Sequence, residues 1–228
     1  NKATGRMTMS RDLLRGLTNT KTAQLFTYNL AMGLSLSITT ITANSLATLC
    51  VGLAMKELIT MKNKKSQRLT ARYDIIQVSY KYALGIDHRQ WDLYETCFTD
   101  ECEFDFSSFS GKPATTLTAK QWRTNVESLN GNFDATAHQM TNHVISKLKK
   151  SSATCITELR AQHWFSQDTM TQLGHPGEMN WCELGGHYTN ELVREGKTWK
   201  IARCALTVRW RLGNEAIFEM ARGRNTAQ

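Results

Sequence analysis

The sequence predicts an α+β fold in which helices come first and an antiparallel sheet follows. Two observations support this prediction. Between about residues 70 and 130, apolar residues recur every three or four positions, as they do in helices. Beyond about residue 135, apolar and polar residues alternate in four long segments joined by short turns, as in an antiparallel meander. Helices segregated from such a sheet define the α+β class.

The first predicted helix of this region covers residues 70–87. Tyr73, Ile76 and Tyr80 belong to one apolar stripe along it, and Asp87 falls on the same stripe at the end of the helix. A carboxylate on a buried face is costly unless it is paired or protonated. Asp87 could therefore cap the next helix, which begins near residue 88, or it could belong to a functional site.

Three shorter elements complete the helical part and the tail. Residues 102–106 alternate apolar and acidic side chains and predict a short strand. Thr118 and Gln121 have the spacing of a capping box, which predicts a helix that ends near Leu129. Residues 216–220 predict a final amphipathic helix.

The meander should contain four strands, at residues 138–148, 153–165, 178–193 and 198–210. Alternate side chains of a strand share a face. On the first strand, His138, Met140, Asn142 and Val144 are expected on one face and His143 on the other.

The second and third strands should each carry polar groups on an otherwise apolar face. On the second strand, a face of small and apolar residues ends at His163. On the third, Leu184, Tyr188 and Asn190 share a face. These strands therefore bring polar side chains toward the interior of the sheet.

The positive charge of the chain lies outside this region. Residues 1–68 hold ten Lys or Arg residues and only two acids, which accounts for the whole net charge of +8. Residues 69–228 are neutral overall, and a domain that binds nucleic acid would present a basic surface. We therefore expect no nucleic-acid partner. The six cysteines have irregular spacing, which predicts neither a disulfide framework nor a metal site and favours a reducing, cytoplasmic location.

Residues 1–68 are expected to be separate from a folded domain at 69–228. Residues 22–55 contain no charge and are long enough to span a bilayer, but they are rich in Ser and Thr. Three interpretations are open: a weak membrane anchor or targeting segment, a poorly ordered extension, or a segment foreign to the native protein. We favour the last two over an anchor, with residues 62–68 as a solvated linker.

Three polar residues of the domain are expected to face inward together: Asp87, His138 and His163. Tyr188 and Asn190 join them. Any one of these is usually a hydrogen-bonded core residue. Two imidazoles and a carboxylate in one apolar cavity are costly unless they satisfy one another, however, and such clusters are typical of acid–base catalysis.

Five segments resemble, in order, the SnoaL-like proteins and scytalone dehydratase. They are residues 82–92, 98–109, 159–163, 186–190 and 199–210, and the resemblance covers residues 69–222. It implies a cone-shaped α+β barrel, in which a curved antiparallel sheet wraps around N-terminal helices and encloses a deep apolar pocket. It also implies a homodimer.

The resemblance implies roles for four residues. In the dehydratase, an aspartate at the position of Asp87 orients a histidine at the position of His163. A second histidine stands at His138, and an asparagine at Asn190. All four residue types are present here.

The sequence also departs from the dehydratase. Ile86 and Phe106 replace tyrosines that hold a water molecule, and Tyr188 aligns with a serine. The water-holding hydroxyls are therefore missing unless Tyr82 or Tyr188 substitutes for them.

We therefore expect a cofactor-independent acid–base enzyme, a dehydratase or isomerase, that acts on a small hydrophobic carbonyl or hydroxy compound. Asp87 and His163 are predicted to form the base, with His138 and Asn190 acting on the substrate oxygen. No metal or organic cofactor is expected. Further substrate contacts are predicted at Tyr82, Tyr188, Phe106, Met140, Leu184 and Trp164.

Two alternatives remain open. One is a polyketide cyclase or epoxide hydrolase that uses Asp87 directly as acid and base. The other is a non-catalytic ligand-binding or dimerisation module, because fold alone does not give function. An open apolar cavity with the acid and the histidines on its wall favours an enzyme, whereas a filled core favours the module.

Overall fold

The structure, a computed structural model, describes residues 43–224 of the chain. The chain divides into two units between Gln67 and Arg68. Helix α2 (Ala43–Asp87) covers this division without a break. The expected linker at residues 62–68 is therefore helical, in keeping with its three Lys, its Gln and its Arg, which favour helix. No helix within residues 43–224 is long and apolar enough to cross a membrane.

The second unit alternates short helices with strands after the end of α2. Its elements are α3 (Trp91–Glu95), β1 (Phe98–Asp105), α4 (Ser107–Ser110), β2 (Thr115–Thr118), α5 (Ala119–Asn130), β3 (Ala135–Ser146), β4 (Ser152–Trp164), α6 (Gln167–Gln172), β5 (Trp181–Glu195), β6 (Thr198–Gly213) and α7 (Ile217–Gly223). The predicted capping box is confirmed, because Thr118 Oγ1 accepts a hydrogen bond from the Gln121 backbone N–H at 3.2 Å and the Gln121 side-chain oxygen accepts one from the Thr118 backbone N–H.

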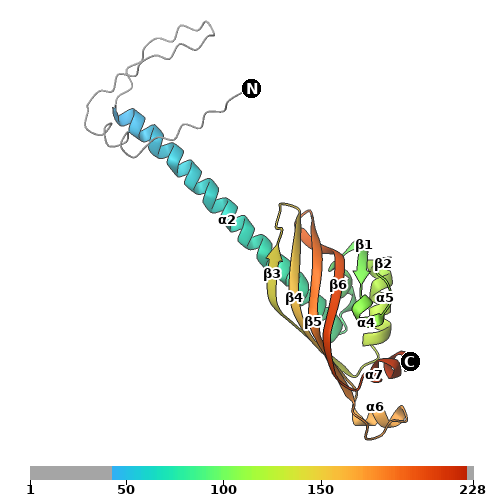
Figure 1. Ribbon diagram of the computed structural model, residues 1–228. Helices are drawn as coiled ribbons and strands as arrows, with labels where there is room; N and C mark the ends of the chain where they lie inside the picture. Colours follow the sequence, from blue (N-terminus) through green and yellow to red (C-terminus); the bar gives the residue numbers. More distant parts are fainter. Residues whose placement is uncertain (1–42, 225–228) are drawn as a thin grey trace. The chain divides into compact units, whose positions relative to one another are not determined.

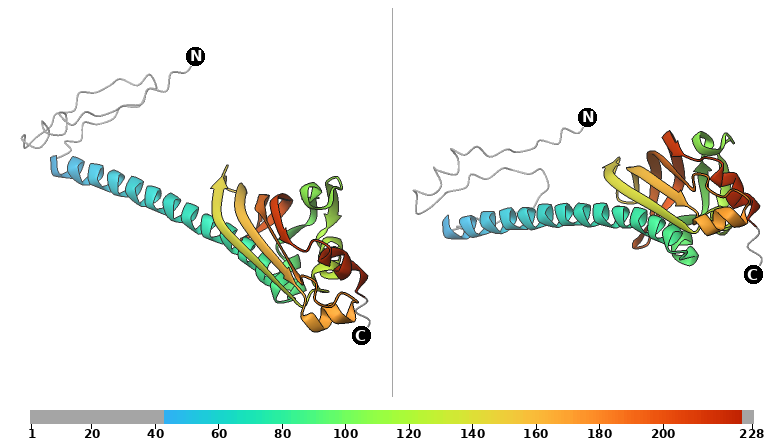
Figure 2. Two further views of the ribbon diagram at one scale, coloured as in Figure 1. Left: turned by 60° about the horizontal axis from the view of Figure 1, so that its bottom comes forward. Right: turned by 90° about the horizontal axis from the view of Figure 1, so that it is seen from below.

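The strands form one six-stranded sheet in the order β2-β1-β6-β5-β4-β3. The long strands β3 to β6 lie side by side and curve together, and α4, α5 and α7 lie over one face (Figure 1). Figure 2 shows the same curvature from two further directions, with α6 and α7 at one end of the unit. The sheet is open, and the predicted α+β fold with a curved sheet is confirmed.

Two details of the sheet differ from the prediction. Strands β1 and β6 pair in parallel, whereas all other pairs are antiparallel. A bulge interrupts β3 between Thr141 and Val144, where Asn142 has a φ of 50°. Val144 therefore faces solvent and Ile145 is buried, so the predicted alternation fails beyond Met140.

Two adjacent glycines allow β5 and β6 to pack closely. A Cβ on Gly186 would clash with the backbone carbonyl of Thr207, and one on Gly185 with the ring of Trp210. We expect Gly186→Ala to lower the free energy of unfolding by about 1–3 kcal/mol, because backbone atoms must move to admit the methyl group. Urea denaturation would measure this, with Gly223→Ala as the control, because nothing lies within 4 Å of a Cβ there. Equal stability of the two variants would contradict the prediction.

Candidate active site

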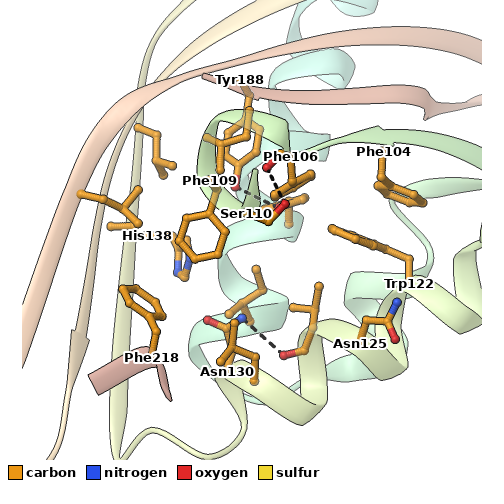
Figure 3. Close-up of a pocket in the computed structure, with 18 of the residues that line it drawn as sticks. Phe104, Phe106, Phe109, Ser110, Trp122, Asn125, Asn130, His138, Tyr188 and Phe218 are labelled. Atoms are coloured by element: carbon orange, nitrogen blue, oxygen red, sulfur yellow. Dashed lines mark hydrogen bonds between the residues drawn. The ribbon is translucent and has the colours of Figure 1, made fainter. Parts of the chain in front are cut away.

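A cavity of about 300 Å³ lies between α5 and the curved sheet. Its wall includes the aromatic rings of Phe104, Phe106, Phe109, Trp122 and Phe218. Figure 3 shows His138 on the sheet side of this cavity and Asn130 on the side of α5. The cavity therefore offers a few polar groups within an apolar enclosure, as small-molecule sites usually do.

Asp87 and His138 form a close pair at the wall of the cavity. The Asp87 carboxylate Oδ1 lies 2.7 Å from His138 Nδ1, and Oδ2 accepts the backbone N–H of His138 at 2.7 Å. Thr136 Oγ1 donates a third hydrogen bond to Oδ1 at 2.9 Å. The predicted bond from His163 to Asp87 is therefore wrong, because the last residue of α2 faces β3 and its carboxylate is occupied there.

These hydrogen bonds stabilise the ionised form of Asp87. Burial raises the pKa of the Asp87 carboxyl, but the hydrogen bonds and charge of His138 and the bond from Thr136 outweigh this effect, so that the pKa lies below its usual value. A carboxylate only accepts hydrogen bonds, so His138 carries its proton on Nδ1. Nε2 then has a free lone pair, and no hydrogen bond of the described residues engages it. This tautomer is that of a general base.

His163 occupies a separate place deeper in the wall. It is only 5% exposed, and its Nε2 lies 3.2 Å from Asn130 Oδ1. The side-chain nitrogen of Asn130 donates to the Val126 carbonyl. The Asn130 oxygen that faces His163 must therefore accept, so His163 carries its proton on Nε2. Its Nδ1 is buried and has no partner within the described residues.

His163 is held in its neutral form. Burial is the main reason that the pKa of His163 lies well below the usual value of 6.5, and repulsion from His138 lowers it further whenever that ring takes up a proton. Its ring packs edge-to-face against Phe218, with the centroids 4.8 Å apart, and lies 5.6 Å from the ring of His138. The predicted base His163 is therefore an uncharged hydrogen-bond acceptor at Nδ1.

Two tyrosines also line the cavity. The hydroxyls of Tyr82 and Tyr188 lie 3.0 Å apart, and both rings are buried. Burial raises the pKa of both phenols, so both remain protonated. Because one hydroxyl donates to the other, the pair has one further O–H, which can donate to the Tyr94 oxygen or to a ligand oxygen.

Comparison with known proteins identifies the family of this fold. Residues 67–205, which make up more than half of the chain, match the family model described as SnoaL-like domain. The chain belongs to the SnoaL-like domain family. The resemblance noted from the sequence is therefore confirmed. Among curated proteins, none matches the sequence.

Solved structures share the SnoaL-like fold. Kfla4162 from Kribbella flavida is 28% identical, with 68% of this chain and 99% of that chain covered and a TM-score of 0.59. A protein from Novosphingobium aromaticivorans described as a "putative scytalone dehydratase" is 17% identical, with 65% and 90% covered and a TM-score of 0.54. The hexachlorocyclohexane dehydrochlorinase LinA-type3 from Novosphingobium barchaimii is 15% identical, with 66% and 94% covered and a TM-score of 0.53.

The cavity of this SnoaL-like domain gathers most of the residues predicted from the sequence. His138, His163, Phe106 and Leu184 line it, as do Tyr82 and Tyr188. Asp87 lies behind His138, where it contacts the imidazole but does not line the cavity. The structure thus places both histidines at the wall of the cavity and the acid behind one of them.

Three predicted contacts lie elsewhere. Trp164 is 42% exposed, because it follows His163 on β4 and so points to the opposite face of the sheet. Met140 packs against the core at the edge strand β3, and Asn190 is buried beyond Tyr188 on β5. Neither lines the cavity, so the expected substrate role of Asn190 is wrong for this geometry.

The sequence interpretation missed three polar residues of the site. Asn130 fixes the tautomer of His163, and Thr136 and Arg89 support Asp87. Asn130 ends α5, a common place for a terminating residue, and Thr136 lies in the strand alternation two residues before His138. The position of Thr136 on the same strand face as His138 was the one feature of the sequence that could have indicated its role. Within residues 43–224, no group of three His, Cys, Asp or Glu residues is arranged to hold a metal ion.

Proposed function

We propose that this cavity is the active site of a lyase or isomerase that removes a proton from carbon in a small hydrophobic carbonyl or hydroxy compound. The observation that carries the proposal is the Asp87–His138 pair at the wall of an aromatic cavity. His138 lines this cavity, and in the neutral ring the bond from Nδ1 to Asp87 leaves the lone pair on Nε2. The general base in this proposal is therefore His138, and His163 has a different role.

The proposed reaction begins with proton transfer from a substrate carbon to His138 Nε2. The resulting imidazolium is stabilised by the Asp87 carboxylate, which is 2.7 Å from Nδ1. In an elimination, the electron pair of the C–H bond forms the new double bond, and a departing hydroxide takes the proton from Nε2 and leaves as water. In an isomerisation, the same proton returns to another carbon. Both outcomes return His138 to its starting state.

The other polar groups of the cavity suit the oxygen atoms of such a substrate. The further O–H of the Tyr82–Tyr188 pair can donate to a carbonyl oxygen as negative charge develops on it. His163 lines the cavity, and its Nδ1 is an acceptor without a partner among the described residues, so it matches a substrate hydroxyl. A hydrophobic hydroxy-ketone carries both groups, and the aromatic walls favour a ring-containing compound.

The names of two relatives support an elimination. A dehydratase removes water and a dehydrochlorinase removes hydrogen chloride, and both reactions take a proton from carbon. Because these two relatives are only 17% and 15% identical to this chain, their similarity is evidence for the fold alone. The proposal therefore depends on the Asp87–His138 geometry.

The test is to incubate the protein with a panel of cyclic and aromatic hydroxy-ketones in D₂O and to follow them by NMR. We expect deuterium to enter the position next to the carbonyl of at least one compound, with or without loss of water. His138→Gln should abolish the exchange. Compounds that quench tryptophan fluorescence in the unaltered protein but not in Trp122→Phe, and that never exchange, would contradict catalysis and favour the ligand-binding module.

A further inference from the structure

Arg89 lies at the turn after α2 and reaches across to the start of β3. Its guanidinium donates to Thr136 Oγ1 at 3.0 Å, to the Phe133 carbonyl at 2.9 Å and to the Ile86 carbonyl at 2.7 Å. Its backbone has a φ of 56°, an unfavourable conformation for a residue with a side chain. The turn thus holds the guanidinium in one place at an energetic cost.

The hydrogen bonds of Thr136 can run in only one direction. A guanidinium has no acceptor, so Arg89 must donate to the hydroxyl. A carboxylate has no donor, so the single hydroxyl proton must point to Asp87 Oδ1, 2.9 Å away. The chain of bonds therefore runs from Arg89 through Thr136 to Asp87 and meets His138 Nδ1 at the same oxygen.

We propose that Arg89 and Thr136 are positioning residues that fix the orientation of the Asp87 carboxylate and, through it, the tautomer of His138. The inference rests on the proposed function only in treating His138 as the base. Neither residue lines the cavity, so neither contacts a ligand there. Their effect on chemistry would reach the substrate only through the Asp87–His138 pair.

The alternative is that these bonds merely tie the turn after α2 to β3. The bond from Arg89 to the Phe133 carbonyl serves that purpose without Thr136, whereas the bond to the Ile86 carbonyl stays within the end of α2. The hydroxyl of Thr136 is different, because its proton goes to a carboxylate that already accepts two bonds from His138. A measurement on the Nδ1 proton of His138 therefore separates positioning from a structural tie.

The experiment follows that proton by NMR in the full chain with ¹⁵N-labelled histidine, without any substrate. The resonance is assigned by its loss in His138→Gln. We expect Thr136→Val to speed its exchange with water by ~10-fold or more, since a bond to a charged group is lost. Thr136→Ser should restore the slow exchange. Thr141→Val, at an exposed position of the same strand, is the matched control.

Arg89→Met provides a second test of the proposal by the same exchange rate. If Arg89 acts through the hydroxyl, the double variant with Thr136→Val should exchange no faster than Thr136→Val alone, because the two residues act in series. Unchanged exchange in folded Thr136→Val, or additive effects in the double variant, would overturn the proposal. The measurement uses free protein, so a failure to find a substrate would count against the proposed function and leave this result intact. With a substrate in hand, Thr136→Val should lower kcat and leave KM nearly unchanged.

Discussion

Asp87→Asn should reduce turnover by ~10²- to 10⁴-fold while the protein remains folded. The reason lies in the direction of a single hydrogen bond. An asparagine amide can donate to His138 Nδ1, which the carboxylate cannot, and the imidazole proton then moves to Nε2. The lone pair that faces the cavity is lost, so the base is present but in the wrong tautomer.

His138→Gln should lose activity to at least the same extent, because it removes the base itself. Single-turnover kinetics would measure both variants, and circular dichroism would establish that they fold. Asp92→Asn is a suitable control, because the Asp92 side chain is 96% exposed and does not line the cavity. We expect its turnover to match that of the unaltered protein.

Near-normal turnover in Asp87→Asn would contradict the proposed mechanism and leave His163 as the next candidate for the base. Activity lost from KM alone, with kcat unchanged, would also count against it. Such a result would mean that the pair binds the ligand and does not act in the chemical step.

The helical and strand periods were sufficient to predict most of the fold. The helical period correctly predicted that a helix ends at Asp87, and α2 does end there. The predicted buried stripe was wrong, because Tyr73 and Tyr80 are 62% and 47% exposed and the neighbouring residues Ile75 and Val78 are buried instead. The alternation around His163 predicted its inward direction, and it is buried. Short elements such as β2 and α4 were missed, because four residues are too few to show a period.

The partner of Asp87 could not be predicted from the same patterns. His138 and His163 were both expected to face inward from neighbouring strands, and a face carries no information about distance across a cavity. In the sheet, Thr136 is the residue opposite His163, and His138 is opposite Ala161. Asp87 pairs with His138 because the end of α2 contacts β3 at that residue. This is a tertiary contact, which the periodicity of the sequence does not contain.

A different kind of failure concerns the far end of β3. Asn142 adopts a left-handed conformation, which shifts the inward and outward alternation by one residue. Every later residue of β3 therefore lies on the face opposite to the predicted one. Asparagine tolerates this conformation better than most residues, but it also occurs in regular strands. The bulge could therefore not be distinguished from a continuous strand without the pairing of β4.

The stability of the protein should fall as the pH drops below about 6.5, and His163 should account for much of the fall. Burial lowers the pKa of this side chain in the folded state, so the unfolded chain binds a proton there more readily than the folded one. Stability then decreases with falling pH, by up to about 1.4 kcal/mol per pH unit for one proton. The decrease begins at the unfolded pKa and continues until the folded side chain is also protonated.

Urea denaturation at intervals between pH 7.5 and pH 4.5 would measure this slope. This window lies above the range in which the carboxyl of Asp87, with its lowered pKa, loses its charge. His163→Phe should be less stable at pH 7.5, because Asn130 loses its partner, but its stability should change less with pH. His175→Gln, at a surface histidine, should keep the original slope. Parallel pH curves for His163→Phe and the unaltered protein would show that His163 is not held neutral by burial, and the assignment of its Nδ1 as an acceptor for a substrate hydroxyl would then be wrong.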